Sequence, residues 1–281
     1  MSRMNELFGR KRSKVLNVYC TAGFPRLDST MEVMRALQDS GADMIELGMP
    51  YSDPLADGPV IQASGARALE NGMSLACLFG QLAEMRASIR VPVLLMGYLN
   101  PILQYGFDQF CSAAAVAGVD GLILPDLPIY EFETVYGPVI RRHGLDFVFL
   151  VTPETSDERI RKVDALSTGF LYAVSSSSTT GSGKDLADQE AYFLRLAGMR
   201  LRNPVLVGFG VRDKTSFEAA CRHTQGAIIG TAYIKAIDGA ADIGKATKEF
   251  LGSILNWAEP CLHLTTDREE SADNKSVETK K

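Results

Sequence analysis

The feature that most constrains the fold is a regular alternation of short apolar runs with amphipathic segments, which continues from residue 16 to Trp257. Several runs are apolar at successive positions, which is typical of strands covered on both faces, as in a parallel sheet. Several amphipathic segments begin at Ser, Thr or Asp residues that can cap a helix, and others end at a glycine. The eight predicted strands cover residues 16–22, 44–49, 92–98, 121–125, 146–152, 170–175, 204–210 and 227–229.

Eight strands that are each followed by a helix predict an α/β fold of the closed (β/α)8 TIM-barrel type. An open, doubly wound sheet has the same alternation, but no predicted strand leads into a GxGxxG phosphate loop. The longest interval lies between the second and third strands, where residues 50–71 are expected to form a loop insertion before a helix at 74–90. We expect one barrel domain over residues 1–260 and a polar, disordered C-terminal tail over 261–281.

Composition excludes several classes of protein. The 29 basic and 34 acidic residues give a net charge of −5, which argues against a general nucleic-acid binder. The sequence contains no apolar run of the roughly 20 residues needed to cross a membrane and no signal peptide. The five cysteines are scattered without CxxC spacing. They predict neither a zinc site nor a disulfide framework, so we expect a cytoplasmic protein without a bound metal.

Two carboxylates stand out near the second predicted strand. Glu46 interrupts an otherwise apolar strand, where it is either a satisfied structural residue or a general acid/base whose pKa is raised by burial. Asp57 follows eleven residues later in a loop with three prolines, residues 50–59. Such loops are often only turns. A second carboxylate placed over the first would suit a reaction that moves a proton and stabilises a transient cation.

Loops rich in small residues follow the last three predicted strands, at residues 175–183, 208–210 and 230–231. Glycine allows a backbone to approach an anion closely, and barrels commonly bind phosphate after strands seven and eight. Together with the two carboxylates, these loops predict an enzyme that acts on a small phosphorylated substrate without a metal.

Four segments carry a resemblance to a known family: ELGMPYSDPLADGPVIQ at 46–62, LLMGYLNP at 94–101, VDGLILPDLP at 119–128 and GFGV at 208–211. They closely resemble the tryptophan synthase α chain, and the resemblance extends over residues 4–258. It implies a TIM-barrel carbon–carbon lyase of tryptophan biosynthesis. This enzyme splits indole-3-glycerol phosphate into indole and glyceraldehyde 3-phosphate by a retro-aldol reaction.

The resemblance also implies roles for individual residues. Glu46 matches the main acid/base, which protonates the indole ring carbon and helps to remove the glycerol hydroxyl proton. Asp57 matches the residue that binds the indole N–H and stabilises positive charge on the ring. The implied substrate contacts are Tyr19, Ile61 and Leu95 in the indole pocket, Tyr172 near the glycerol moiety, Thr180 in the closing loop, and Gly181, Gly210, Gly230 and Thr231 around the phosphate.

The family resemblance further implies a partner, a pyridoxal-phosphate β chain in an α2β2 complex that receives indole through a tunnel. This chain itself is expected to carry no cofactor, with Lys184 and Lys235 at the surface. Docking is expected at residues 53–59, at 100–105 and in the loop after Asp126. The loop at residues 176–181 departs from the family pattern, because it keeps the threonine and final glycine but lacks the usual arginine and first glycine. This departure concerns loop closure and not the class of reaction.

Two alternatives compete with this interpretation. A non-catalytic regulatory or binding subunit could keep the barrel, but the presence of Glu46 and Asp57 argues against it. A related phosphate-binding barrel, such as an indole-glycerol-phosphate-forming enzyme or a sugar-phosphate isomerase, typically uses a lysine or cysteine on a strand. No predicted strand carries a lysine, and Cys20 is the only cysteine on one.

Overall fold

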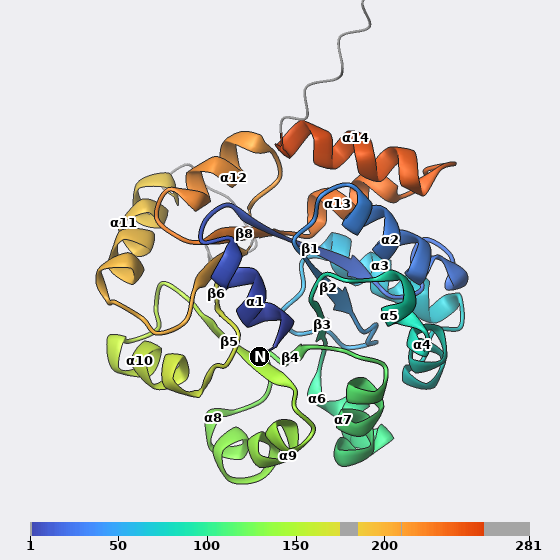
Figure 1. Cartoon of the computed structure of the whole chain (residues 1–281), viewed down its shortest axis with the longest axis horizontal. Coiled ribbons are helices and arrows are strands. Elements are labelled where there is room, and N and C mark those ends of the chain that lie inside the picture. Colours follow the sequence, from blue (N-terminus) through green and yellow to red (C-terminus); the bar gives the residue numbers. More distant parts are fainter. Residues whose placement is uncertain (1, 175–184, 209, 256–281) are drawn as a thin grey trace, which may run out of the picture.

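Eight parallel strands close into a barrel in the computed structural model, which describes residues 2–174, 185–208 and 210–255, without the side chains of 185–189 (Figure 1). Each strand pairs with the next, and β8 pairs with β1, so the predicted (β/α)8 barrel is confirmed and the open sheet is excluded. The strands are β1 Val15–Thr21, β2 Met44–Gly48, β3 Val93–Met96, β4 Gly121–Ile123, β5 Asp146–Val151, β6 Leu171–Val174, β7 Val205–Gly208 and β8 Gly226–Ile229.

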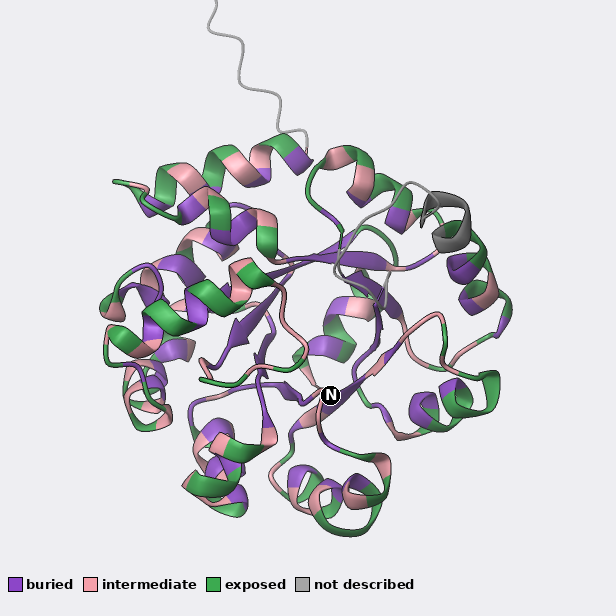
Figure 2. Ribbon diagram, turned by 180° about the vertical axis from the view of Figure 1, so that it is seen from behind, coloured by how far each residue is buried: buried purple, intermediate pink, exposed green. Residues whose placement is uncertain are grey.

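Helices surround the barrel and bury the faces that they turn toward it, while their outer faces are exposed (Figure 2). A 3-10 turn, η1 (Leu27–Ser29), precedes α2, and a π-helical turn, η2 (Phe132–Tyr136), links α8 to α9. The described α-helices are α1 Arg3–Arg10, α2 Thr30–Asp39, α3 Pro59–Glu70, α4 Leu75–Leu82, α5 Met85–Ser88, α6 Leu99–Tyr105, α7 Phe107–Val116, α8 Ile129–Glu131, α9 Gly137–Arg142, α10 Asp157–Leu166, α11 Asp185–Gly198, α12 Lys214–Cys221, α13 Thr231–Ile237 and α14 Ile243–Leu255.

The strand register determines which side chains face the interior of the barrel. Residues paired in a parallel ladder lie on the same face of the sheet, and successive residues alternate between faces. Tyr19 pairs with Glu46, and Glu46 pairs with Leu94, so these three residues belong to one inward-facing set. Every residue of β1 and β2 is nevertheless buried, because the helices cover the outer face. This double burial explains the unbroken apolar runs in the sequence.

The segment between β2 and β3 differs from the prediction. Residues 50–71 do not form only a loop, because α3 begins at Pro59 with Gly58 as its N-cap. The buried residues of α3 are Ser64, Gly65 and Ala68, so the helix carries almost no apolar periodicity in its sequence. The helix expected at 74–90 is two helices, α4 and α5, since the backbone leaves helical geometry at Glu84 (φ −112°, ψ 21°).

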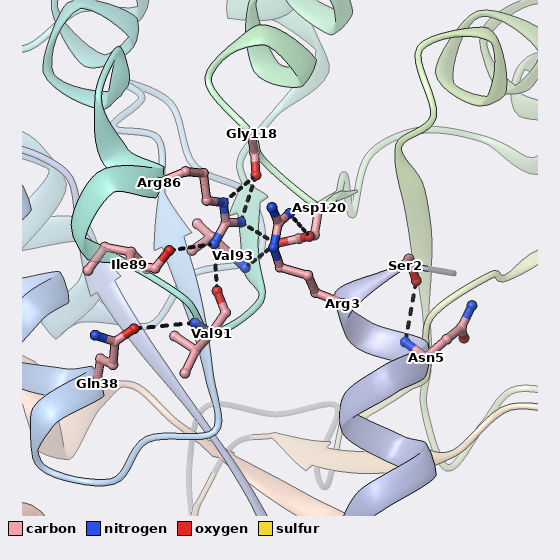
Figure 3. Close-up of polar contacts among 10 residues, drawn as sticks. All are labelled: Ser2, Arg3, Asn5, Gln38, Arg86, Ile89, Val91, Val93, Gly118 and Asp120. Atoms are coloured by element: carbon pink, nitrogen blue, oxygen red, sulfur yellow. Dashed lines mark hydrogen bonds and ion pairs between the residues drawn. The ribbon is translucent and has the colours of Figure 1, made fainter.

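A polar network closes the amino-terminal end of the barrel, where α1 lies across the strands (Figures 1 and 3). Asp120, just before β4, accepts hydrogen bonds from the Arg3 side chain at 2.9 Å, from the Arg86 guanidinium and from the Val93 backbone N–H at 2.8 Å. Arg86 also donates to the Gly118 carbonyl at 2.8 Å. The opposite, carboxyl-terminal end of the strands is where barrel enzymes place their active sites.

No described helix is long and apolar enough to cross a membrane. The predicted polar tail, residues 261–281, lies outside the described residues.

Candidate active site

A cavity of about 340 Å³ opens at the carboxyl-terminal ends of the strands. Strands β1, β2, β3, β6 and β8 contribute Tyr19, Glu46, Met96, Tyr172 and Ile228, and the segments that follow β2, β7 and β8 complete its wall. The residues that line it are Tyr19, Glu46, Asp57, Gly58, Pro59, Val60, Ile61, Met96, Tyr172, Gly210, Val211, Ile228, Gly230, Thr231 and Lys235.

Glu46 is a buried carboxyl group on the cavity wall, with 1% of its surface exposed. The Asn17 side-chain amide, on the neighbouring strand β1, donates a hydrogen bond to Glu46 Oε2 at 3.0 Å. Burial raises the pKa of Glu46 to about 8; the Asn17 hydrogen bond opposes this shift, and the negative charge of Asp57 adds to it. Glu46 therefore carries its proton at neutral pH and can act as an acid.

Asp57 lies in the loop between β2 and α3 and is half-buried. Burial raises its pKa, whereas a hydrogen bond from the Tyr98 hydroxyl lowers it. Two contacts fix its backbone: the Gln62 side-chain amide donates to the Asp57 carbonyl at 2.8 Å, and the Ala56 N–H donates to the Tyr98 hydroxyl at 3.0 Å. The first turn of α3 and Tyr98, two residues after the end of β3, thus hold this carboxylate against the cavity.

Two tyrosine rings line the cavity because the adjacent strands offer glycines beside them. A Cβ added at Gly48 would lie 2.0 Å from the Tyr19 hydroxyl, and one at Gly208 would lie 2.2 Å from the Tyr172 ring. In each case the tyrosine belongs to one strand and the glycine to the next strand in the barrel. Burial raises the pKa of both tyrosines well above the ordinary value, so both stay neutral.

The structure brings most of the predicted site residues together. Glu46, Asp57 and the Tyr19 and Tyr172 rings all line one cavity. Ile61, Gly210, Gly230 and Thr231 also line this cavity. Thr180 and Gly181 lie outside the described residues.

The structure does not bring Leu95 to this cavity. In the β2–β3 register, Glu46 pairs with Leu94 and Gly48 pairs with Met96, so Leu95 points to the opposite face of the sheet. Leu95 is fully buried and absent from the cavity wall, where Met96 stands instead. Strand alternation accounts for this placement, because Leu95 and the inward-facing Met96 are neighbours in the chain.

Three residues of the site were not predicted from the sequence to belong to it. Asn17 is a polar residue in an apolar strand, two positions before Tyr19 and therefore on the same face. Tyr98 reaches Asp57 from beyond β3 without any local signal. Lys235 is exposed, as expected, yet it also lines the cavity, and its spacing of four residues from Thr231 on α13 places both on one helical face.

Comparison with known proteins identifies the family to which this chain is similar. The family model described as the tryptophan synthase alpha chain matches residues 6–254. A tryptophan synthase alpha chain of Parabacteroides distasonis is 49% identical over 255 residues, covering 90% of this chain and 99% of the relative. One of Flavobacterium johnsoniae is 48% identical over 242 residues, covering 86% and 95% of the two chains.

Solved structures agree with the sequence comparison. The crystal structure of tryptophan synthase subunit alpha from Legionella pneumophila superposes with a TM-score of 0.83 at 36% identity, covering 91% of this chain and 98% of that chain. A crystal structure of tryptophan synthase from M. tuberculosis, in an aminoacrylate-bound form, gives a TM-score of 0.79 at 30% identity, covering 90% and 100%. On this evidence the chain belongs to the tryptophan synthase alpha chain family.

Proposed function

We propose that Glu46 and Asp57 carry out the reaction of this family, the cleavage of indole-3-glycerol phosphate to indole and glyceraldehyde 3-phosphate in tryptophan biosynthesis. The observation that carries the assignment is a pair of carboxyl groups on one cavity wall, of which one, Glu46, is fully buried, so that burial raises its pKa to about 8. A carbon leaving group must be protonated before it departs, and a buried carboxylic acid is suited to this task.

Glu46 acts first as an acid and then as a base. Its carboxyl proton goes to the indole ring carbon that bears the glycerol chain, which converts the ring to an indolenine-like cation. The Glu46 carboxylate then accepts the proton of the adjacent glycerol hydroxyl. The O–H electrons form the aldehyde C=O bond, and the electrons of the breaking C–C bond neutralise the ring. Glu46 ends the cycle protonated, so no other proton carrier is required.

Asp57 stabilises the cationic ring. As a carboxylate it accepts a hydrogen bond from the indole N–H, and this bond strengthens as positive charge develops on the ring. The position of Asp57 is set by Tyr98 and by the first turn of α3. An attractive interaction that grows toward the transition state accelerates the chemical step.

The remaining wall residues suit the two other parts of the substrate. Tyr19, Ile61, Met96 and Tyr172 provide apolar surface for a flat indole ring. The phosphate group is assigned to a second set of residues around the loops that follow β6, β7 and β8. That set comprises Gly181, Gly210, Gly230 and Thr231 together with Lys235, and Thr180 is assigned to the closure of the site.

The proposal includes a partner, a pyridoxal-phosphate β chain in an α2β2 complex, with no cofactor in this chain and a cytoplasmic location. Each predicted docking segment presents an exposed apolar side chain: Leu55 (84% exposed), Leu103 (44%) and Tyr130 (72%). Exposed large apolar side chains of this kind are suited to contact a partner protein. The four described cysteines are free thiols, which suits a reducing compartment.

Indole release from indole-3-glycerol phosphate by the purified chain, with and without an added β chain, tests the proposal. Glu46→Gln is expected to remain folded and to lose about 10²–10⁴-fold in kcat, and Asp57→Asn nearly as much. Glu84→Gln, an exposed change outside the cavity, is the matched control. A Glu46→Gln variant that retains more than a tenth of the wild-type rate would show the assignment to be wrong.

A further inference from the structure

Three buried hydroxyl groups form a chain from the cavity wall to helix α3. The Tyr19 hydroxyl lies 3.4 Å from Thr21 Oγ1, Thr21 Oγ1 lies 2.7 Å from Ser64 Oγ, and Ser64 Oγ donates to the Ile61 carbonyl at 2.8 Å. Tyr19 is 9% exposed, and Thr21 and Ser64 are each 2% exposed. The chain therefore joins β1 to α3 across a region that water does not reach.

The Tyr19 hydroxyl is an acceptor in this chain. The Thr21 hydroxyl donates to the Tyr19 hydroxyl, and either hydroxyl can be the donor in the contact between Thr21 and Ser64. The Ser64 hydroxyl also donates to the Ile61 carbonyl, which only accepts. A phenylalanine at position 19 would remove the acceptor of the buried Thr21 hydroxyl, which is costly.

The Tyr19 hydroxyl has little freedom to leave its position. Its oxygen would lie 2.0 Å from a Cβ at Gly48, so the tyrosine fills the space that this glycine leaves open. Burial, and next the negative charge of Asp57, raise the pKa of Tyr19 well above the ordinary value, so the hydroxyl keeps its proton. A fixed, protonated hydroxyl group is well suited to anchor a neighbouring element.

Helix α3 transmits this anchoring to the catalytic loop. Its first turn is tied to Asp57 by the Gln62 side chain, which donates to the Asp57 carbonyl at 2.8 Å. The Gln62 N–H donates to the Gly58 carbonyl at 3.0 Å. Ser64 follows Gln62 by two residues in the same helix, so its bond to Thr21 fixes how the first turn lies against the barrel.

We propose that the Tyr19 hydroxyl is a positioning group that acts through Thr21 and Ser64 to hold the first turn of α3, and with it Asp57, in the arrangement that the reaction requires. Tyr19 is thus more than the apolar wall residue that the family resemblance implies. This inference rests on the role proposed above for Asp57. A displacement of a catalytic group by a fraction of an ångström lowers the rate of the chemical step and affects ground-state binding less.

The experiment compares Tyr19→Phe and Ser64→Ala with the wild-type chain in the indole-release assay. Each variant is expected to lower kcat about five- to tenfold and to change KM less than about twofold. Tyr233→Phe is the matched control, because Tyr233 and Thr247 form a buried hydroxyl pair at 2.9 Å outside the cavity. The control should lose comparable thermal stability and keep the wild-type kcat.

Double variants separate positioning from a general loss of structure. If the hydroxyls act as one chain, Tyr19→Phe and Ser64→Ala together should lower kcat no more than either change alone. If the chain acts through Asp57, Tyr19→Phe should not reduce the residual rate of Asp57→Asn further. Unchanged kcat in Tyr19→Phe, multiplicative effects of the two hydroxyl changes, or a further loss in the Asp57→Asn background would each overturn the inference. Full activity of Asp57→Asn alone would instead refute the proposed function.

Discussion

The Asn17 side-chain NH2 group donates to Glu46 Oε2 at 3.0 Å, and the side-chain oxygen of Asn17, Oδ1, is buried without a hydrogen-bond partner among the described residues. The contact is therefore directed from Asn17 to the carboxyl group. A donor favours the charged form of a carboxyl group, so Asn17 opposes the effect of burial. Asn17 keeps the Glu46 pKa close enough to neutrality for the same group to give a proton and to take one back.

Asn17→Ala should raise the pKa of Glu46 because it removes the interaction that lowers it. Glu46 must be protonated to start the reaction, so wild-type kcat is expected to fall as the pH rises through about 8. In Asn17→Ala this alkaline limb should move to higher pH. A kcat profile between pH 6 and 10 measures the shift, with Asn5→Ala on α1 as the control. An unchanged or lower alkaline pKa would contradict the role of Asn17.

Glu46→Gln should lower activity and raise the free energy of unfolding. The folded-state pKa of Glu46 is raised, so its contribution to stability is fully present below the unfolded pKa, near 4.3, and is lost as the pH rises through about 8. Glutamine avoids the burial of a charge. The gain in the free energy of unfolding should therefore increase from pH 5 to pH 9, to on the order of 5 kcal/mol. Denaturant titrations at pH 5, 7 and 9 measure it, and a gain independent of pH would contradict the raised pKa.

The barrel could be predicted from the sequence because double burial produces unbroken apolar strands, and the strand positions follow directly from them. The helix α3 could not be predicted in this way, since it buries Ser64, Gly65 and Ala68 and carries little apolar periodicity. The prolines and aspartates just before it are typical of a loop, so the local sequence did not indicate that a helix begins at Pro59.

In the candidate site, too, some residues could be predicted from the sequence and others could not. Glu46 stands out because a carboxyl group in an apolar strand is costly, and this signal is local. Leu95 lies off the cavity wall and Met96 lies on it, because a shift of one position along a strand reverses the face to which a side chain points. Tyr98 and the hydroxyl chain from Tyr19 to Ser64 depend on contacts between distant segments, for which a single sequence carries no signal.

Lys235→Gln should weaken substrate binding without a comparable loss in kcat. Among the described residues that line the cavity, Lys235 is the only basic one. Loss of a charge-assisted contact to phosphate costs about tenfold in KM, and the difference should shrink at high salt because the site is open to solvent. Lys248→Gln, on the exposed face of α14, is the control. Equal KM values for Lys235→Gln and the wild type at low salt would remove Lys235 from the phosphate site.

Asp120→Asn should destabilise the barrel and leave the chemistry intact. Asp120 is buried beneath Arg3 and Arg86, and its loss leaves the largely buried Arg86 without its counter-charge. Breaking a buried pair in this way costs about 3–5 kcal/mol. Arg3→Ala removes a cation that is 44% exposed and should cost about 1 kcal/mol or less. Urea titration measures the free energy of unfolding of both variants. A similar loss for the two would show that burial does not determine how much each charge contributes to stability.

Tyr130→Asp should separate binding of the β chain from catalysis by this chain alone. Tyr130 is 72% exposed on α8 and is absent from the cavity wall, so the isolated variant is expected to keep the wild-type rate of indole release. A charge on a docking face must be desolvated when the partner binds, and at the centre of an interface such a change costs 2 kcal/mol or more, about 30-fold in affinity. This affinity is measured by titrating the β chain into each variant and recording the increase in the rate of indole release. Val116→Asp on α7, at an equally exposed apolar site (85%) outside the three docking segments, should bind as the wild type does. If Val116→Asp weakens binding and Tyr130→Asp does not, the docking face lies on α7, and the segment after Asp126 has no part in it.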